Sequence, residues 1–289
     1  MEKIIIEVGS TCTKVDMYDG EKVNRIGNYT IEFKRNYKKE NKLEENDVKR
    51  LIDVVKELKK KYNDIYICGT SIFRSLTEEQ RNEFLERFLN ETEIEFDIIS
   101  PEKENVLTVL GATQKIESRV AVFVGGGGST EIAIYEDGIK EMINTPVGVM
   151  DAMAKFPDLG ENLASTDVEE VKKFVRENLN LPKQKADILI LAGGGHLFFA
   201  LNSGVKYEKN TLYDDELEPV MMDFETRKSE TTRYYKEISL DEIRKKVDDP
   251  NWWYATRAMC AFVLVVAEEI GAKCIVPTDI TMVYGLLDK

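Results

Sequence analysis

Apolar and polar positions in the first part of the chain predict a β-meander followed by a helix. Residues 3–8 are β-branched and apolar, and residues 14–18 alternate before Asp19-Gly20, a strong signal for a two-residue hairpin turn. Residues 47–62 then carry apolar side chains at helical spacing, with Asn46 expected as the N-cap. We therefore expect a strand, a tight turn, a strand, a hairpin, a strand and an amphipathic surface helix.

Strands and helices alternate further along the chain. Residues 64–68 and 94–99 are short apolar runs typical of buried strands, and residues 77–89 have helical spacing. Ser100-Pro101 predicts a helix start, because serine caps helices and proline is favoured at their first position. This helix is expected to run to Ile116.

The same order of elements begins again at Arg119. Residues 120–124 form a buried apolar run, a glycine run follows, residues 131–135 form the next strand, and Asp137-Gly138 marks a second hairpin turn. A repeated order of elements implies two similar domains that face one another across a cleft. The predicted fold is therefore α/β, with duplicated domains at residues 1–117 and 118–289.

The second half also has elements of its own. Helices are expected at residues 167–179 and 252–270, and a strand at residues 187–191 leads into Gly193-Gly194-Gly195-His196. A helix that starts after this glycine triplet could accept a phosphate at its N-terminus. Residues 205–238 are polar and irregular, so no element is predicted there.

Composition and charge restrict the function. The formal net charge of −13 argues against a nucleic-acid partner held by a broad basic face. The longest apolar helical stretch, residues 258–267, is too short to span a bilayer, and the N-terminus lacks a signal-peptide pattern, so a cytoplasmic location is expected. Four scattered cysteines have no metal-binding spacing, and a single histidine leaves carboxylates as the candidates for acid–base chemistry.

Two glycine-rich turns are the candidate phosphate-binding loops. In the second, missing side chains let backbone N–H groups approach an anion, and two hydroxyls add donors. Glycine runs also make tight bends, but four successive glycines cost considerable backbone entropy, which favours the binding interpretation. The two loops are expected to bind a phosphate from opposite sides. The residues are Gly9, Ser10 and Thr11 in the first turn, and Gly125, Gly126, Gly127, Gly128, Ser129 and Thr130 in the second.

These turns belong to a set of motifs that resembles a known family. The motifs lie at residues 7–11, 70–74, 99–104, 126–131, 145–149 and 255–258. In order and spacing, over nearly the whole chain, they resemble those of the exopolyphosphatase and guanosine pentaphosphate phosphatase family. The family belongs to the actin-like ATPase and sugar kinase superfamily, whose duplicated ribonuclease-H-like fold agrees with the repeat.

The resemblance implies roles for four residues. Arg74 matches a phosphate-contacting arginine, and Glu104 matches the carboxylate that activates the attacking water. Glu131 matches an acid that helps to hold a divalent metal or to position the water, and Glu7 stands at the position of a first-loop aspartate. Magnesium held through Glu7 and Glu131 is implied, because it binds through few carboxylates plus substrate phosphates. Without the resemblance, Arg74 would be interpreted as a surface ion-pair partner and Glu104 as a solvated first-turn residue.

Two departures from the family pattern leave three functions open. Val124 stands where the family pattern has an aspartate, and residues 281–285 lack a charged pair. Either another acid, such as Glu7 or Asp279, supplies the lost charge, or catalysis is weak or absent. The first hypothesis is a phosphohydrolase acting on inorganic polyphosphate or a guanosine pentaphosphate-type substrate. The second is a phosphate- or nucleotide-binding sensor without hydrolysis. The third is an ATP-binding ATPase or kinase, favoured if residues 193–195 contact adenine.

Short substrates, or a groove built by a homodimer, are expected because the helical extension of longer polyphosphatases is not evident.

Overall fold

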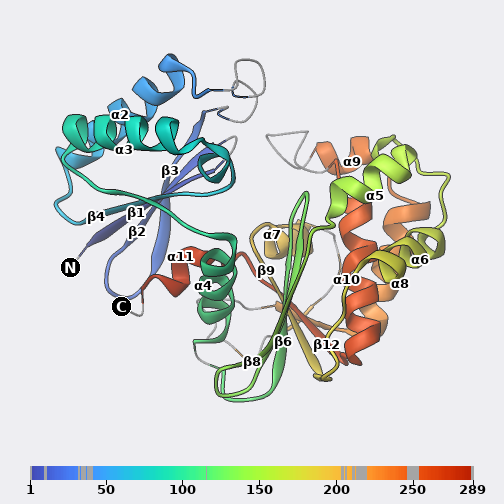
Figure 1. The fold of residues 1–289 in the computed structure, drawn as a ribbon. Helices are drawn as coiled ribbons and strands as arrows, with labels where there is room; N and C mark the ends of the chain where they lie inside the picture. The colour runs from blue at the N-terminus through green and yellow to red at the C-terminus, as the bar shows by residue number, and fades with distance from the viewer. Residues whose placement is uncertain are drawn as a thin grey trace. The chain divides into compact units, whose positions relative to one another are not determined.

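The computed structural model contains two compact units, residues 1–107 and 108–288 (Figure 1). The division falls inside helix α4 (Pro101–Thr113), whereas the sequence places the boundary after that helix. Each unit has its own mixed sheet. The structure describes residues 2–9, 12–31, 33, 37, 42–114, 116–202, 205, 207–209, 212, 220–245 and 254–287.

The first unit is built on a five-stranded sheet with the order β3-β2-β1-β4-β5. β1 to β3 form an antiparallel meander, and β4 and β5 continue the sheet in parallel with β1. Helices α2 and α3 cover one face, where their apolar sides pack on Ile4, Ile6 and Val8 (Figure 1). The elements are β1 (Lys3–Val8), β2 (Cys12–Tyr18), β3 (Val23–Thr30), α2 (Glu45–Lys59), β4 (Ile65–Gly69), the 3-10 helix η1 (Ser71–Ser75), α3 (Glu78–Thr92) and β5 (Phe96–Ile98).

The second unit has a seven-stranded sheet with the order β10-β11-β12-β9-β6-β7-β8. Its strands are β6 (Val120–Gly125), β7 (Thr130–Tyr135), β8 (Ile139–Thr145), β9 (Ile188–Ala192), β10 (Glu208–Lys209), β11 (Val220–Asp223) and β12 (Cys274–Pro277). Its helices after α4 are α5 (Val149–Lys155), η2 (Pro157–Gly160), α6 (Val168–Asn178), α7 (His196–Asn202), α8 (Phe224–Lys236), α9 (Leu240–Arg244), α10 (Thr256–Ile270) and α11 (Met282–Gly285).

The predicted duplication is visible in the strand order and in its irregularities. The strands β8-β7-β6-β9-β12 repeat β3-β2-β1-β4-β5 with the same parallel and antiparallel pairings. The pairing of the second and third strands shifts register once in each unit. The first hairpin is closed alike in both units, since Gly9 N–H donates to the Cys12 carbonyl and Gly126 N–H to the Ser129 carbonyl, both at 2.9 Å. The fold is therefore a duplicated ribonuclease-H-like α/β fold.

Both faces of the central strands in the second sheet are covered. Helices α5, α6 and α10 pack on one face, against side chains such as Phe123 and Leu191. The end of α4 packs on the other face, where Val109 and Ala112 meet Val122. Burial on both faces explains why these strands are continuous apolar runs rather than alternating ones.

Of the two predicted N-caps, one is confirmed and one is wrong. The Ser100 hydroxyl accepts the Lys103 N–H at 3.1 Å, as expected of an N-cap. The N-cap of α2 is Glu44, so the prediction of Asn46 was wrong, and α4 ends at Thr113 rather than Ile116. Helix α10 begins at Thr256, and the predicted start at Trp252 lies outside the described residues.

The largest correction concerns residues 205–238, which were predicted to be irregular. They include helix α8, whose buried residues are largely polar in type: Arg227, Thr231, Tyr234 and Tyr235. These residues fall at helical spacing, but a pattern based on apolar residues alone does not identify them.

A bilayer-spanning helix would need a longer apolar run than any helix in the described part of the chain provides.

Candidate functional site

Arg74 and Glu104 are brought together in the first unit by two neighbouring parallel strands. Arg74 lies in η1, directly after β4, and Glu104 lies in the first turn of α4, directly after β5. Arg74 Nη1 donates to Glu104 Oε2 at 2.8 Å and to the Ile99 carbonyl at 3.1 Å. The two side chains keep 26% and 32% of their surface exposed. The predicted phosphate ligand and the predicted base are therefore an accessible ion pair.

Glu7 lies in a row of polar positions that crosses the first sheet. It is paired with Lys14 on β2 and with Cys68 on β4, and Cys68 is paired with Asp97 on β5. Lys14 Nζ contacts Glu7 Oε1 at 3.3 Å, while the buried Glu7 Oε2 has no hydrogen-bond partner among the described residues. Burial, followed by the charges of Glu7, Asp97 and Glu104, raises the pKa of the Cys68 thiol. Cys68 is consequently protonated and unsuited to act as a nucleophile.

The second glycine loop, residues 125–130, is hydrogen-bonded to the start of α5. The N–H groups of Val149 and Met150 donate to the carbonyls of Gly126 and Gly127 at 3.1 and 2.9 Å. A Cβ atom on Gly148 would come within 2.5 Å of the Gly126 oxygen, so this close approach requires glycine. The loop is thus held in one position by the helix behind it.

The predicted phosphate-binding residues differ in their exposure. Gly127 and Gly128 form the exposed tip of the loop, and Ser129 is half-buried. Thr130 is buried, and its hydroxyl donates to the Val147 carbonyl at 2.8 Å, which is a structural contact. In the first loop Gly9 closes the turn, whereas Ser10 and Thr11 lie outside the described residues.

Glu131 and Val124 are paired directly across β6 and β7. Glu131 is buried, and Val124 lies beside Gly193, where an added Cβ would come within 3.0 Å of its Cγ1 atom. The residues that the structure describes contain no group of three or more acidic, cysteine or histidine side chains able to hold a metal. Magnesium held by Glu7 and Glu131 stays a prediction.

The second unit contains a cavity of about 210 Å³, and both glycine-rich segments of this unit, residues 125–127 and 194–195, line it. Sequence reasoning missed its main charged residue, Arg227, because Arg227 lies in the stretch predicted to be irregular. The helical spacing of the residues buried on α8 is the signal that could have found it. The lining residues are Gly125, Gly126, Gly127, Val149, Gly194, Gly195, His196, Phe199, Arg227, Ala255, Thr256, Met259 and Cys260.

His196 is a packing residue in the wall of this cavity. Its ring lies edge-on to Phe123 with the centroids 6.3 Å apart. Burial, together with the nearby charge of Arg227, lowers the pKa of His196 to about 3, so the imidazole is neutral at physiological pH. The start of α7 does not offer a phosphate site, because Asp279 Oδ1 already accepts the Leu197 N–H at 3.1 Å. Asp279 therefore caps α7.

Comparisons with known proteins agree with the fold and with the motifs. The model of the Ppx/GppA phosphatase family matches residues 24–240. A structure of the Aquifex aeolicus PPX-GPPA enzyme has a TM-score of 0.76 at 22% identity, covering 99% of this chain and 98% of that one. A crystal structure of the Aquifex aeolicus member of the Ppx/GppA family has a TM-score of 0.78 at 22% identity, with 99% and 96% covered. An exopolyphosphatase from Cytophaga hutchinsonii has a TM-score of 0.69 at 14% identity, with 100% and 97% covered.

No curated protein matches the sequence. The solved structures, all at low identity, show the shared fold, and the family match spans most of the chain and both units. The chain belongs to the Ppx/GppA phosphatase family and has a duplicated ribonuclease-H-like α/β fold.

Proposed function

We propose that the protein hydrolyses a phosphoanhydride, with inorganic polyphosphate or a guanosine pentaphosphate-type compound as substrate. The observation that carries the proposal is the Arg74–Glu104 pair at 2.8 Å, half-exposed in a chain of this phosphatase family. A guanidinium suits phosphate oxygens, and a carboxylate beside the bound phosphate suits the removal of a proton from water.

In this mechanism phosphate oxygens compete with Glu104 for the Arg74 guanidinium. Glu104 then accepts a proton from the attacking water while the water oxygen bonds to the terminal phosphorus and the anhydride oxygen leaves. The backbone N–H groups at the exposed tip, Gly127 and Gly128, are proposed to hold the phosphate with Gly9 and Ser129. Ser10 and Thr11 complete the proposed set, and Thr130 supports the loop through Val147.

Magnesium fits the oxygen donors available here. The buried Glu7 Oε2 has no hydrogen-bond partner among the described residues, which leaves one carboxylate oxygen for a cation. Glu7 and Glu131 are proposed to hold the ion, which would neutralise phosphate charge when bound. Alternatively, Glu131 is proposed to position the attacking water.

One observation favours a second candidate function. Val124 places an apolar side chain beside Gly193, at a position where the resemblance implies an aspartate. A site that keeps the phosphate loops but loses a carboxylate would bind phosphate compounds without hydrolysing them. The second candidate is therefore a phosphate- or nucleotide-binding sensor. The homodimer and the cytoplasmic location also stay predictions.

Phosphate release tests these functions. Purified protein is incubated with polyphosphate, guanosine pentaphosphate or ATP, each with magnesium or with a chelator. We expect release from one of the first two substrates with magnesium and loss of release with chelator. Release from ATP alone would indicate an ATPase instead, and no release from any substrate would favour the sensor.

A pair of variants connects the activity to the site. Arg74→Met should weaken substrate binding by about tenfold or more, because a charge-assisted contact is lost. The matched control is Arg87→Met in the same unit, since Arg87 is ion-paired with Glu45 and Glu91 on the helical side. If the two variants bind substrate equally well, Arg74 is not part of the binding site.

A further inference from the structure

Arg227 is a buried arginine without a counter-ion in the described part of the chain. Arg227 as a whole residue is 4% exposed to solvent. Its Nη2 atom contacts the Cys260 sulfur at 3.6 Å, and its Nε atom has no hydrogen-bond partner among the described residues. Since a guanidinium remains charged in proteins, burying it unpaired costs several kcal/mol. A ligand that supplies negative charge would offset this cost.

The side chain borders the cavity of about 210 Å³, and a second source of positive potential borders the same space. The first turn of α10, at Thr256, lines the cavity. The N-cap of this 15-residue helix is Ala255, which makes no side-chain cap, and the first turn has no acidic residue. The positive end of the helix dipole therefore faces the same cavity as Arg227.

The remaining walls suit a small anion. No carboxylate is among the described residues that line the cavity. Gly126, Gly127 and Gly194 leave backbone rather than side chains at its surface. One water occupies about 30 Å³ in the liquid, so a tetrahedral anion with several waters fits the space.

We propose that this cavity is a binding site for an oxyanion of the phosphate class, with Arg227 as its principal ligand and the start of α10 as its second. This inference deepens the proposed function and rests on it in part, because Gly127 both lines the cavity and belongs to the proposed phosphate-holding set. The two proposals are tested separately: the cavity by the effect of Arg227 on anion binding, and hydrolysis by phosphate release.

Isothermal titration with inorganic phosphate tests the role of Arg227. Arg227→Met should weaken binding by about tenfold or more, the loss expected for a charge-assisted contact. The control is Arg233→Met on the same helix, because Arg233 is already paired with Glu230 at 2.8 Å. This control removes the same charge and should keep wild-type affinity. Unchanged affinity in Arg227→Met would overturn the proposal, and Arg227→Lys serves as the second variant if Arg227→Met does not fold.

The only histidine of the chain gives a direct probe of the site in the wild-type protein. His196 lines the cavity and senses the charge of Arg227, so an anion on Arg227 should shift the imidazole proton resonances in NMR spectra. The neutralised guanidinium should also let the pKa of His196 rise. Phosphate binding without any change at His196 would place the anion elsewhere and overturn the proposal.

Two sources share this ligand chemistry: free phosphate and a phosphate group of a larger compound. The NMR titration is therefore run with inorganic phosphate and, separately, with tripolyphosphate. A shift with phosphate alone supports a site for the free ion. A shift with tripolyphosphate alone supports a site for one group of a longer chain. No shift with either probe at millimolar concentration would overturn the proposal.

Discussion

Two buried arginines of the second unit have opposite surroundings. Arg257 is 0% exposed, and it makes five hydrogen bonds of 2.7–3.2 Å to the backbone carbonyls of Leu159, Glu161, Asn162, Tyr234 and Ile238. Arg227 is also buried, but one cysteine sulfur is its hydrogen-bond partner in the described residues. A guanidinium with all its donors used joins segments of the fold, whereas one with free donors on a cavity is placed for a ligand. Burial alone therefore does not reveal the role of a charged residue.

The largest predicted effect separates these two arginines by stability. Arg257→Met should lower the free energy of unfolding by about 4 kcal/mol or more, because several buried carbonyls lose their donor. Arg227→Met should change it by less than about 1 kcal/mol or raise it, since an unpaired buried charge is removed. Urea unfolding of both variants measures the difference, and equal losses would contradict the comparison.

The next effect concerns the glycine loop that borders the Arg227 cavity. Gly148→Ala should destabilise the protein by about 2 kcal/mol, because its Cβ would lie 2.5 Å from the Gly126 oxygen and must displace backbone. Gly128→Ala is the matched control, since a Cβ there would meet no atom within 4 Å. If thermal unfolding shows equal changes for both variants, the loop is not fastened as described.

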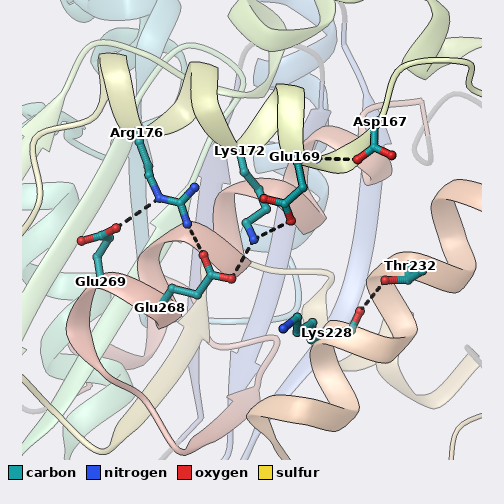
Figure 2. Close-up of polar contacts among 8 residues, drawn as sticks. All are labelled: Asp167, Glu169, Lys172, Arg176, Lys228, Thr232, Glu268 and Glu269. Carbon is teal, nitrogen blue, oxygen red and sulfur yellow. Dashed lines mark hydrogen bonds and ion pairs between the residues drawn. The ribbon is translucent and has the colours of Figure 1, made fainter.

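Lys172 is intermediate between Arg257 and Arg227, because it is a buried cation with two counter-ions (Figure 2). Its side chain is 5% exposed and donates to Glu169 and Glu268 at 2.9 and 2.7 Å, while Arg176 also contacts Glu268. Lys172→Met should cost about 1–2 kcal/mol, because Arg176 still neutralises Glu268. Lys173→Met is the control at an exposed position and should be neutral within error.

The pH dependence of the Lys172 effect has a definite sign. Burial acts to lower the pKa of Lys172, but the hydrogen bonds and charges of Glu268 and Glu169 raise it above its ordinary value. This contribution to stability is therefore complete below pH 10.5 and is lost as the pH rises through the higher folded-state pKa. Wild type and Lys172→Met should differ least in urea midpoints measured above that range. A difference that instead grew with pH would contradict the assigned contacts.

The smallest predicted effect tests the charge of Arg227 through His196. The pKa of His196 is lowered from 6.5 to about 3, so the unfolded state binds the proton first and stability falls as the pH drops from 6.5 toward 3. Arg227→Met should raise this pKa by about one unit, worth about 1.4 kcal/mol, because burial remains but the repelling charge is gone. An NMR titration of His196 measures both values, and an unchanged pKa would show that Arg227 does not act on the imidazole.

Local sequence signals were sufficient to predict the duplicated fold. Asp137 and Gly138 both adopt positive φ, as the hairpin dipeptide predicts, and Ser100 and Asp167 cap their helices through their own side chains. Such signals depend on neighbours within a few residues, so they can be interpreted without tertiary structure. Their repeated order along the chain predicted the two similar domains, whereas the order of strands within each sheet comes from the structure.

The chemistry of the site depended on contacts between distant residues and was predicted less completely. Arg74 and Glu104 could be singled out through the family motifs, but their ion pair depends on how β4 and β5 align. The structural use of the Thr130 hydroxyl depends on the position of Val147. Arg227 was missed because its helix buries polar residue types, which an apolar pattern does not identify.

The central claim is that Glu104 activates water beside Arg74, and the turnover of Glu104→Gln tests it most directly. The amide is nearly isosteric, so the variant should bind substrate like wild type but release phosphate roughly a hundredfold more slowly, the scale of a lost general base. Glu102→Gln in the same helical turn is the control and should keep wild-type turnover. Unchanged turnover in Glu104→Gln, with measurable activity in wild type, would contradict the claim.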